Sequence, residues 1–191
     1  MGNRNELFNA IPIFDSGLTD QEIREFSIRN KQGQGLVNYL HGYAESDEDK
    51  KIMRTYIIRD SDTNEFVGYF SLKAGMISIN EQKIGEKEYF DTLPGVELAN
   101  FAINDTYIKK HPSMKGCGRI IFDLLIVPII EEVSKKIGVK IIYIFSLPID
   151  SLINRYIDYG FMRLASKEEN ELHRRLKPNY DENCVFMYQE L

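Results

Sequence analysis

The sequence predicts a mixed α/β fold in which helices flank a central sheet. A polar turn at residues 60–64 separates two β-branched and aromatic segments, 55–58 and 66–72, a pattern typical of a β-hairpin. A long helical pattern begins at Gly118, and the near-continuous apolar segment 139–145 after it is typical of a strand buried in a parallel sheet. Together they indicate at least one right-handed strand–helix–strand crossover.

Two helices are predicted before the hairpin. Thr19 is a candidate N-cap, and Glu22 completes a capping box ahead of an apolar stripe. Apolar residues at helical spacing predict a second helix over 34–44. The acidic run 45–49 is expected to form a solvated loop.

The remaining elements are predicted from glycine and proline residues that end or interrupt helices and strands. Pro94 and Gly95 are expected to interrupt the chain before a third strand at 96–104. The helix that begins at Gly118 is expected to run to 137 and to kink at Pro128. A short helix at 149–158, an extended segment from Phe161 and a last strand at 185–188 complete the prediction.

Length and composition indicate a single domain over residues 1–191. They argue against a disordered, collagen-like or coiled-coil protein. No apolar run is long enough to cross a bilayer, and the first residues lack the pattern of a signal peptide, so we expect a soluble cytoplasmic protein with no membrane partner. The net charge of −5 disfavours nucleic acid as a partner. Two cysteines and three scattered histidines show no metal-binding spacing, so no metal is expected.

The segment 115–119, Lys-Gly-Cys-Gly-Arg, is the most informative one for function. Two glycines one residue apart let successive backbone N–H groups face one point, and the helix that follows adds unpaired N–H groups and a positive dipole end. Alone, this pattern fits either an anion site or an ordinary tight turn. Neither a P-loop nor a dinucleotide-binding fingerprint is present.

The flanking segments add a resemblance to a known family. Residues Phe101-Ala102-Ile103, the Gly116 and Gly118 loop, and Tyr156 with Gly160-Phe161 occur in the order found in the GNAT superfamily of acyl-CoA-dependent N-acyltransferases. This resemblance, clear over about residues 52–164, implies a mostly antiparallel central sheet with a splayed parallel strand pair and flanking helices. It also implies transfer of an acetyl group from acetyl-CoA, the co-substrate, to a primary amine.

The resemblance assigns the co-substrate site to two segments. The pantetheine would pair with Phe101, Ala102 and Ile103, and the pyrophosphate would lie at the loop made by Ser113, Lys115, Gly116, Cys117, Gly118, Arg119 and Ile120. Ser113 departs from the family, which usually has Gln or Arg there, so a side-chain contact is lost or supplied by Lys115.

Two residues are candidates for the chemistry. Glu97 stands six residues before Ile103, where some family members carry a general base; the alternative is an edge-strand glutamate that faces solvent. Tyr156 matches a tyrosine that protonates the leaving thiolate in many family members; the alternative is a tyrosine that only packs in the core.

The acceptor cannot be read from these motifs. By resemblance, segments near 19–44 and 165–183 shape its pocket, and the acidic N-terminal half favours a small-molecule or peptide amine. Aminoacyl-tRNA stays open as an acceptor, and a homodimer is compatible with the sequence. The main alternative function is a non-catalytic module that binds or senses acyl-CoA. A nucleotide-phosphate binder is disfavoured, because Gly116 rather than Ser or Thr follows Lys115.

Overall fold

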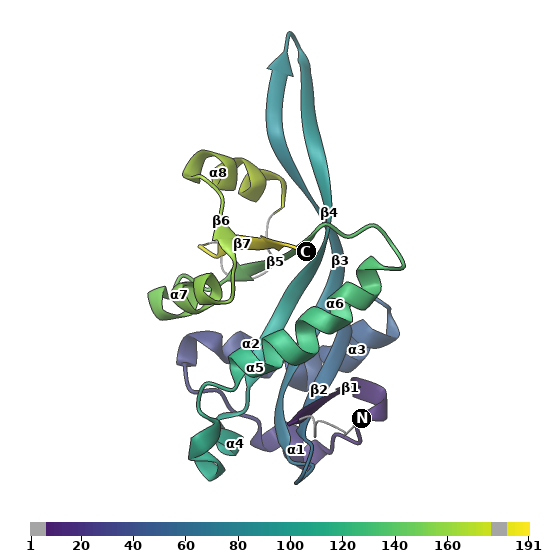
Figure 1. Cartoon of the computed structure of the whole chain (residues 1–191), viewed down its shortest axis with the longest axis vertical. Coiled ribbons are helices and arrows are strands. Elements are labelled where there is room, and N and C mark those ends of the chain that lie inside the picture. The colour runs from purple at the N-terminus through teal and green to yellow at the C-terminus, as the bar shows by residue number, and fades with distance from the viewer. Residues whose placement is uncertain (1–6, 177–182) are drawn as a thin grey trace, which may run out of the picture. The chain divides into compact units, whose positions relative to one another are not determined.

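The computed structural model describes residues 7–176 and 183–191. Within these residues the strands hydrogen-bond in the order β1-β2-β3-β4-β5-β7-β6 (Figure 1). The β4–β5 pair is parallel, whereas the β1–β2, β2–β3, β5–β7 and β6–β7 pairs are antiparallel. The predicted mixed, mostly antiparallel sheet is confirmed. The strands are β1 (Phe8–Pro12), β2 (Arg54–Asp60), β3 (Phe66–Ile84), β4 (Lys87–Ile103), β5 (Ile141–Ser146), β6 (Met162–Arg163) and β7 (Val185–Glu190).

The helices connect these strands. They are α1 (Asp20–Glu25), α2 (Gln34–Gly42), α3 (Ala44–Asp49), α4 (Asp105–Lys110), α5 (Gly118–Ile121), α6 (Val127–Ser134), α7 (Asp150–Asp158) and α8 (Ser166–Arg175). A π-helical turn, Phe122–Ile126, joins α5 to α6. No helix among the described residues has the length and apolar character needed to span a bilayer.

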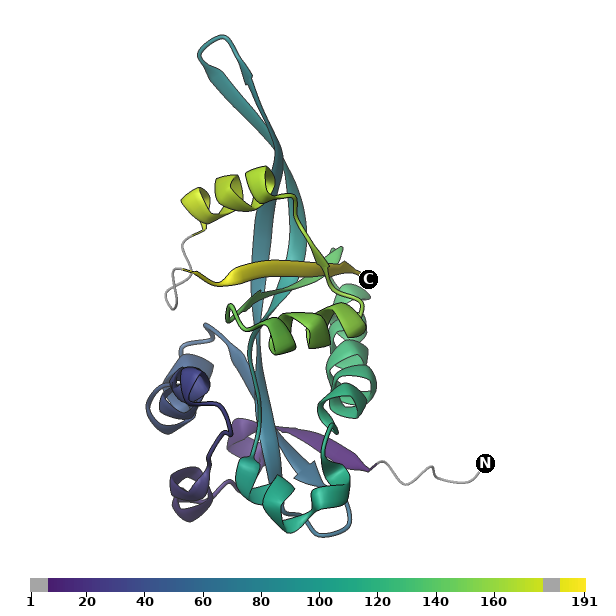
Figure 2. The same ribbon diagram turned by 90° about the vertical axis from the view of Figure 1, so that its left-hand side faces the viewer.

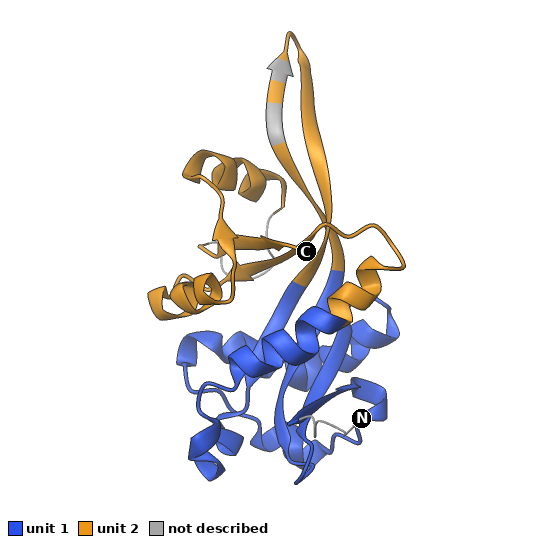
Figure 3. Cartoon of the chain, in the orientation of Figure 1, with its two compact units in different colours: residues 1–73, 98–128 blue, residues 74–97, 129–191 orange. Residues whose placement is uncertain are grey.

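The chain divides into two compact units, each built from separate stretches of sequence (Figure 3). Unit 1 comprises residues 1–73 and 98–128, and unit 2 comprises residues 74–97 and 129–191. Strands β3 and β4 contribute residues to both units. Of the predicted acceptor-pocket segment 165–183, residues 177–182 lie outside the described residues.

Unit 1 is a layered α/β structure. Helices α1–α3 cover one face of its strands, and α5 with the π-helical turn covers the other (Figure 2). Ile57 on β2 lies opposite Tyr69 on β3, and both belong to the core cluster that α2 completes with Val37 and Leu40. The predicted capping box at Thr19 is present and starts α1.

Unit 2 has its own core. Its central residues are Ile77 of β3, Ile141 and Tyr143 of β5, Phe186 of β7 and Leu172 of α8. The rings of Tyr143 and Phe186 lie 5.8 Å apart. Helix α8, which the sequence analysis did not predict, therefore contributes directly to this core.

The acidic run 45–49 was predicted to be a loop, and this prediction is wrong. These residues belong to α3, and Glu48 is buried. Its carboxylate accepts a hydrogen bond from the Thr55 backbone N–H and pairs with Arg54. A specific partner for one carboxylate thus outweighs the solvation expected for an acidic run.

The predicted break at Pro94 and Gly95 is also wrong, because β4 runs through both residues. A chain reversal at Gly85, where φ is +65°, instead joins β3 to β4. Proline is compatible with a strand where its missing N–H is not needed by a neighbour, and the Pro94 carbonyl still accepts a hydrogen bond from Lys140.

The helix predicted over 118–137 begins at Gly118 as expected but ends at Ser134, and it has a local distortion before Pro128. The Val127 N–H donates to the Phe122 carbonyl, five residues earlier, which makes the π-helical turn. Proline removes one helical hydrogen bond and crowds the preceding turn, and widening that turn relieves the clash.

Candidate functional site

The glycine loop that precedes α5 is held in a conformation that only glycine adopts readily. Gly116 has a φ of +93°, in the left-handed region, and a Cβ built there would meet no atom within 4 Å. The loop follows the short 3-10 helix Pro112–Met114 and leads directly into the N-terminus of α5. Open space around the backbone makes this loop accessible to a ligand.

The backbone donors of this loop are only partly used. The Cys117 N–H donates to the Met114 carbonyl, and the Arg119 N–H donates to the Gly116 carbonyl. The N–H groups of Gly116, Gly118 and Ile120 have no hydrogen-bond acceptor in the described part of the chain. Alternate N–H groups in a glycine-rich turn at a helix start are the usual cradle for a phosphate. We call residues 116–120 the cradle.

The side chains predicted to bind an anion differ in their exposure and in the partners they already have. Lys115 and Ser113 are exposed beside the cradle, whereas Arg119 forms an ion pair with Asp123 one helical turn away. Cys117 is only 3% exposed, and burial raises the pKa of its thiol to about 11. The thiol is therefore protonated at neutral pH and fills space beneath the cradle rather than acting as a nucleophile.

The end of β4, with the predicted pantetheine-binding residues, also belongs to unit 1. Ala102 is buried in the core cluster with Tyr69 of β3, and Phe101 and Ile103 are partly exposed. Gly68 of β3 lets the strands approach closely, because a Cβ there would lie 2.3 Å from the Ala102 carbonyl oxygen. The parallel β4–β5 ladder ends at Glu97, so the backbone of residues 98–103 has no β5 ladder on its other edge among the described residues.

The other predicted residues belong to unit 2. Glu97 is 6% exposed and lies directly opposite Tyr143 of β5 in the parallel ladder. The Tyr143 hydroxyl donates a hydrogen bond to the Glu97 carboxylate, and burial followed by the Glu97 charge raises the pKa of Tyr143. The alternative in which Glu97 faces solvent is wrong. Gly75 of β3 provides the room for this pair, since a Cβ there would lie 1.8 Å from the Tyr143 hydroxyl oxygen.

Tyr156 on α7 is 9% exposed, and its ring packs edge-on against Tyr159 and Phe161 at 5.9 and 5.5 Å. Burial raises the pKa of Tyr156, so the hydroxyl keeps its proton at neutral pH. The hydroxyl has no hydrogen-bond partner among the described residues. Gly160 ends α7 with a φ of +96°, and a Cβ there would lie 3.1 Å from the Gln189 amide nitrogen. Local packing thus accounts for the motif formed by Tyr156, Gly160 and Phe161.

The structure groups the predicted residues by unit. Residues 101–103 and the cradle lie in unit 1, and Glu97 and Tyr156 lie in unit 2. Tyr143, the hydrogen-bond partner of Glu97, was not predicted from the sequence. Its only signal was a polar hydroxyl in the apolar strand 139–145, at a position that a buried strand fills more simply with an aliphatic residue.

Comparisons with known proteins agree with this architecture. No family model and no curated protein matches the sequence. A solved tyrosine-to-phenylalanine variant of KacT aligns over 96% of this chain and 93% of its own, with 18% identity and a TM-score of 0.66. AtaT complexed with acetyl-methionyl-tRNAfMet aligns over 94% of this chain and 93% of its own, with 17% identity and a TM-score of 0.63. AtaTR bound with AcCoA aligns over 96% of this chain and 93% of its own, with 16% identity and a TM-score of 0.63. At these identities the likeness establishes the fold, which is the GNAT fold predicted from the motifs.

Proposed function

We propose that the protein is an acetyl-CoA-dependent N-acetyltransferase. The observation that carries this proposal is the cradle, whose N–H groups at Gly116, Gly118 and Ile120 fit the pyrophosphate of CoA. The fold supports it as well, since AtaTR, which is similar to this chain, has been solved with AcCoA bound. Lys115 adds a positive charge beside the cradle, and the open backbone edge at 101–103 suits the peptide-like pantetheine.

The reaction needs one bond to form and one to break. The amine nitrogen of the acceptor attacks the thioester carbonyl carbon, a C–N bond forms, and the C–S bond then breaks. The thiolate of CoA must gain a proton, and the attacking amine must lose one. A backbone N–H that faces the carbonyl oxygen stabilises the negative charge that develops there.

In this proposal Tyr156 supplies the proton to the thiolate. A general acid must hold its proton at working pH, and the buried Tyr156 hydroxyl does so; burial, which raises its pKa, also makes it a weaker acid than a free tyrosine. The absence of a hydrogen-bond partner for its hydroxyl within the described residues leaves the group available to a ligand. Solvent returns the proton to Tyr156 after CoA leaves.

Glu97 accepts the proton of the amine in this proposal, and Tyr143 positions its carboxylate. The burial of Glu97 supports the assignment, since a carboxylate kept from water and oriented by one hydroxyl is prepared to bind an ammonium group. A hydrogen bond between neighbouring strands fixes one carboxylate orientation better than a solvated side chain could.

The finer proposal concerns the acceptor. We infer that the amine belongs to an aminoacyl-tRNA, because AtaT, which shares the fold over nearly the whole chain, has been solved with acetyl-methionyl-tRNAfMet. This replaces the small-molecule or peptide amine as the first acceptor to test. The net charge of −5 opposes it, but residues 95–164 carry a net +2 and include Lys115 beside the cradle.

A panel of acceptors tests both levels of the proposal. Aminoacyl-tRNAs, peptides with free N-termini and small amines are each incubated with acetyl-CoA, and mass spectrometry detects the acetylated product. Acetylated aminoacyl-tRNA supports the full proposal. Acetylation of a peptide or small amine alone retains the enzyme and overturns the tRNA assignment. Binding of acetyl-CoA without any product favours the alternative, a module that only binds or senses acyl-CoA.

A further inference from the structure

The β3–β4 hairpin of unit 2 has a strand edge that no other described strand covers. We call residues 74–94 the arm. Its tip extends past α8 in two perpendicular views (Figures 1 and 2). Strand β4 pairs with β5 only over Gly95–Glu97, so in the described part of the chain no strand covers that edge over residues 87–93. Unpaired N–H and C=O groups along a strand edge are a template for another strand.

The arm also exposes large apolar side chains. Met76, Ile84, Tyr89 and Phe90 are between 48% and 65% exposed, and all four lie within the arm. A two-stranded ribbon is only marginally stable in water, and exposed apolar groups on it gain from being covered. Both features suit the arm to pairing with another strand.

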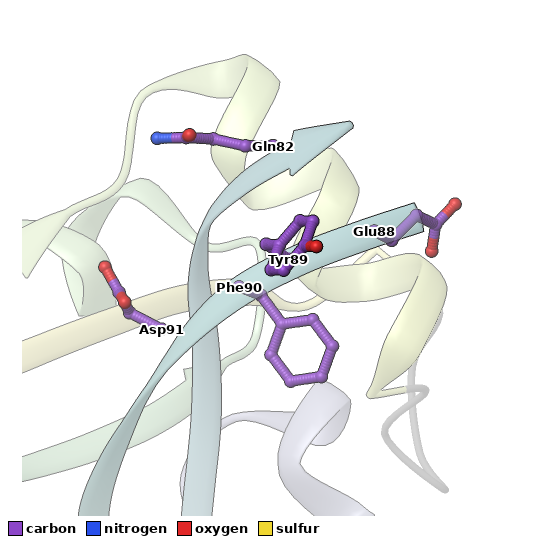
Figure 4. Close-up of a pocket in the computed structure, with 5 residues that line it drawn as sticks. All are labelled: Gln82, Glu88, Tyr89, Phe90 and Asp91. Carbon is purple, nitrogen blue, oxygen red and sulfur yellow. The ribbon is translucent and has the colours of Figure 1, made fainter. Parts of the chain in front are cut away.

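Helix α8 distinguishes the two faces of β4 in the arm. The Arg175 guanidinium lies 3.6 Å from the Glu88 carboxylate and 4.6 Å from the centre of the Phe90 ring, so both side chains are on the α8 side. Tyr89 and Phe90 leave the strand on different sides (Figure 4). By strand alternation, Lys87, Tyr89 and Asp91 share the other face.

We propose that β4 pairs antiparallel with β4 of a second copy of this chain, about a two-fold axis at Tyr89. The sequence 87–91 is self-complementary in this register. Lys87 of each copy lies opposite Asp91 of the other, and the two Tyr89 rings lie opposite each other. A surface hollow of about 420 Å³, lined by Gln82, Glu88, Tyr89, Phe90 and Asp91, lies at the same part of the arm.

Neighbouring registers are less favourable. An axis at Glu88 places two glutamates opposite each other, and an axis at Phe90 leaves Lys87 opposite Leu93 and Asp91 opposite Tyr89. Only the Tyr89 register among these three forms two ion pairs. A second copy is therefore the occupant that the charges on this edge select, and the interface is isologous, as in most two-fold dimers.

Sedimentation of charge variants tests the proposal. The wild-type protein should sediment with twice the 22.2 kDa mass of one chain. Lys87→Glu or Asp91→Lys alone places like charges opposite each other twice and should raise the dimer dissociation constant at least about tenfold. The double variant restores both ion pairs and should recover the dimer. A monomer at all concentrations, or a double variant no better than either single one, overturns the proposal.

Cysteine cross-linking tests the register independently. Opposite residues in an antiparallel pair have Cα atoms about 4.5–5.5 Å apart, within the range that a disulfide bridges. Tyr89→Cys should therefore form a covalent dimer on mild oxidation. Glu88→Cys is the matched control, because residue 88 of the second copy lies diagonally across from it, too far away for a disulfide to form. Cys117 and Cys184 are buried and should stay reduced. Equal cross-linking of the two variants contradicts the Tyr89 register.

Discussion

The hydroxyl of Tyr143 donates a hydrogen bond to the carboxylate of Glu97, the residue directly opposite it in the parallel ladder of β4 and β5. Gly75 on β3 leaves the space that the hydroxyl occupies. Three strands of unit 2 thus fix the position of one buried carboxylate. A strand position that could have held an apolar residue instead holds an oriented acidic group.

Substitutions of this pair test whether the carboxylate is the base. Glu97→Gln keeps the shape and removes the proton acceptor, so we expect kcat/KM to fall by about 10²-fold or more at unchanged acetyl-CoA affinity. Tyr143→Phe removes only the positioning hydrogen bond and should cause a smaller loss, mainly in kcat. If Glu97→Gln retains most of the activity, Glu97 is a structural residue and another group removes the proton.

The close fit of Gly75 to Tyr143 predicts a non-additive effect on stability. Gly75→Ala places a methyl group 1.8 Å from the hydroxyl oxygen and should destabilise the protein by about 1–3 kcal/mol through overpacking. Tyr143→Phe removes that oxygen, although the ring carbon that bore it is still 2.9 Å away. Urea unfolding of the double variant should therefore show less destabilisation than the sum of the single variants. Strict additivity would mean that the two residues do not contact each other.

Tyr156→Phe separates acid catalysis from packing. The ring contacts with Tyr159 and Phe161 remain in this variant, so the melting temperature should be unchanged. Loss of the proton donor should lower kcat by roughly 10²–10⁴-fold with little change in acetyl-CoA affinity. Turnover close to that of the wild type would return Tyr156 to a packing role.

The cradle predicts how acetyl-CoA stabilises the protein. Acetyl-CoA and CoA should both raise the melting temperature, because a ligand that binds only the folded state stabilises it. Gly118→Asp introduces bulk and negative charge at an unpaired N–H and should abolish both shifts. Gly35→Ala in α2, where a Cβ meets no atom within 4 Å, is the matched control and should keep them. Equal shifts in the two variants would place the cofactor elsewhere.

Burial of Cys117 predicts an alkaline loss of stability. The thiol pKa rises from its ordinary value of 9.0 to about 11 in the folded chain, so between these pH values the folded state holds more protons than the unfolded state. Stability then falls as pH rises, by at most about 1.4 kcal/mol per pH unit from this group. Its contribution is complete below pH 9. The difference in unfolding free energy between wild type and Cys117→Ala should shrink from pH 9 to 11, and a constant difference would contradict the burial of the thiol.

Local patterns predicted the elements that depend on local chemistry. The capping box at Thr19, the hairpin of β2 and β3, the helix after Gly118 and the short helix before Gly160 follow from caps, turns and glycines whose preferences are intrinsic. The fold followed from the same motifs, because their order fixes how strand, loop and helix succeed one another.

The burial of two carboxylates depends on partners outside their own segments. Glu48, wrongly placed in a solvated loop, is buried because the Thr55 N–H and Arg54 meet it, and Glu97, whose burial the sequence left open, is buried beside Tyr143. A carboxylate in a sequence pattern is read as solvated until such a partner is known. The arm was missed because Pro94 usually ends a strand, whereas here its carbonyl is bonded and its missing N–H is tolerated.

Direct measurement of acetyl transfer tests the central claim. Thiol release from acetyl-CoA is followed together with acetylation of the acceptor that performs best in the panel. We predict one free CoA for each acetyl group transferred, at a rate that depends on both substrates. Acetyl-CoA that binds the protein yet releases no CoA with aminoacyl-tRNA, peptide or small-amine acceptors would contradict the assignment as an N-acetyltransferase.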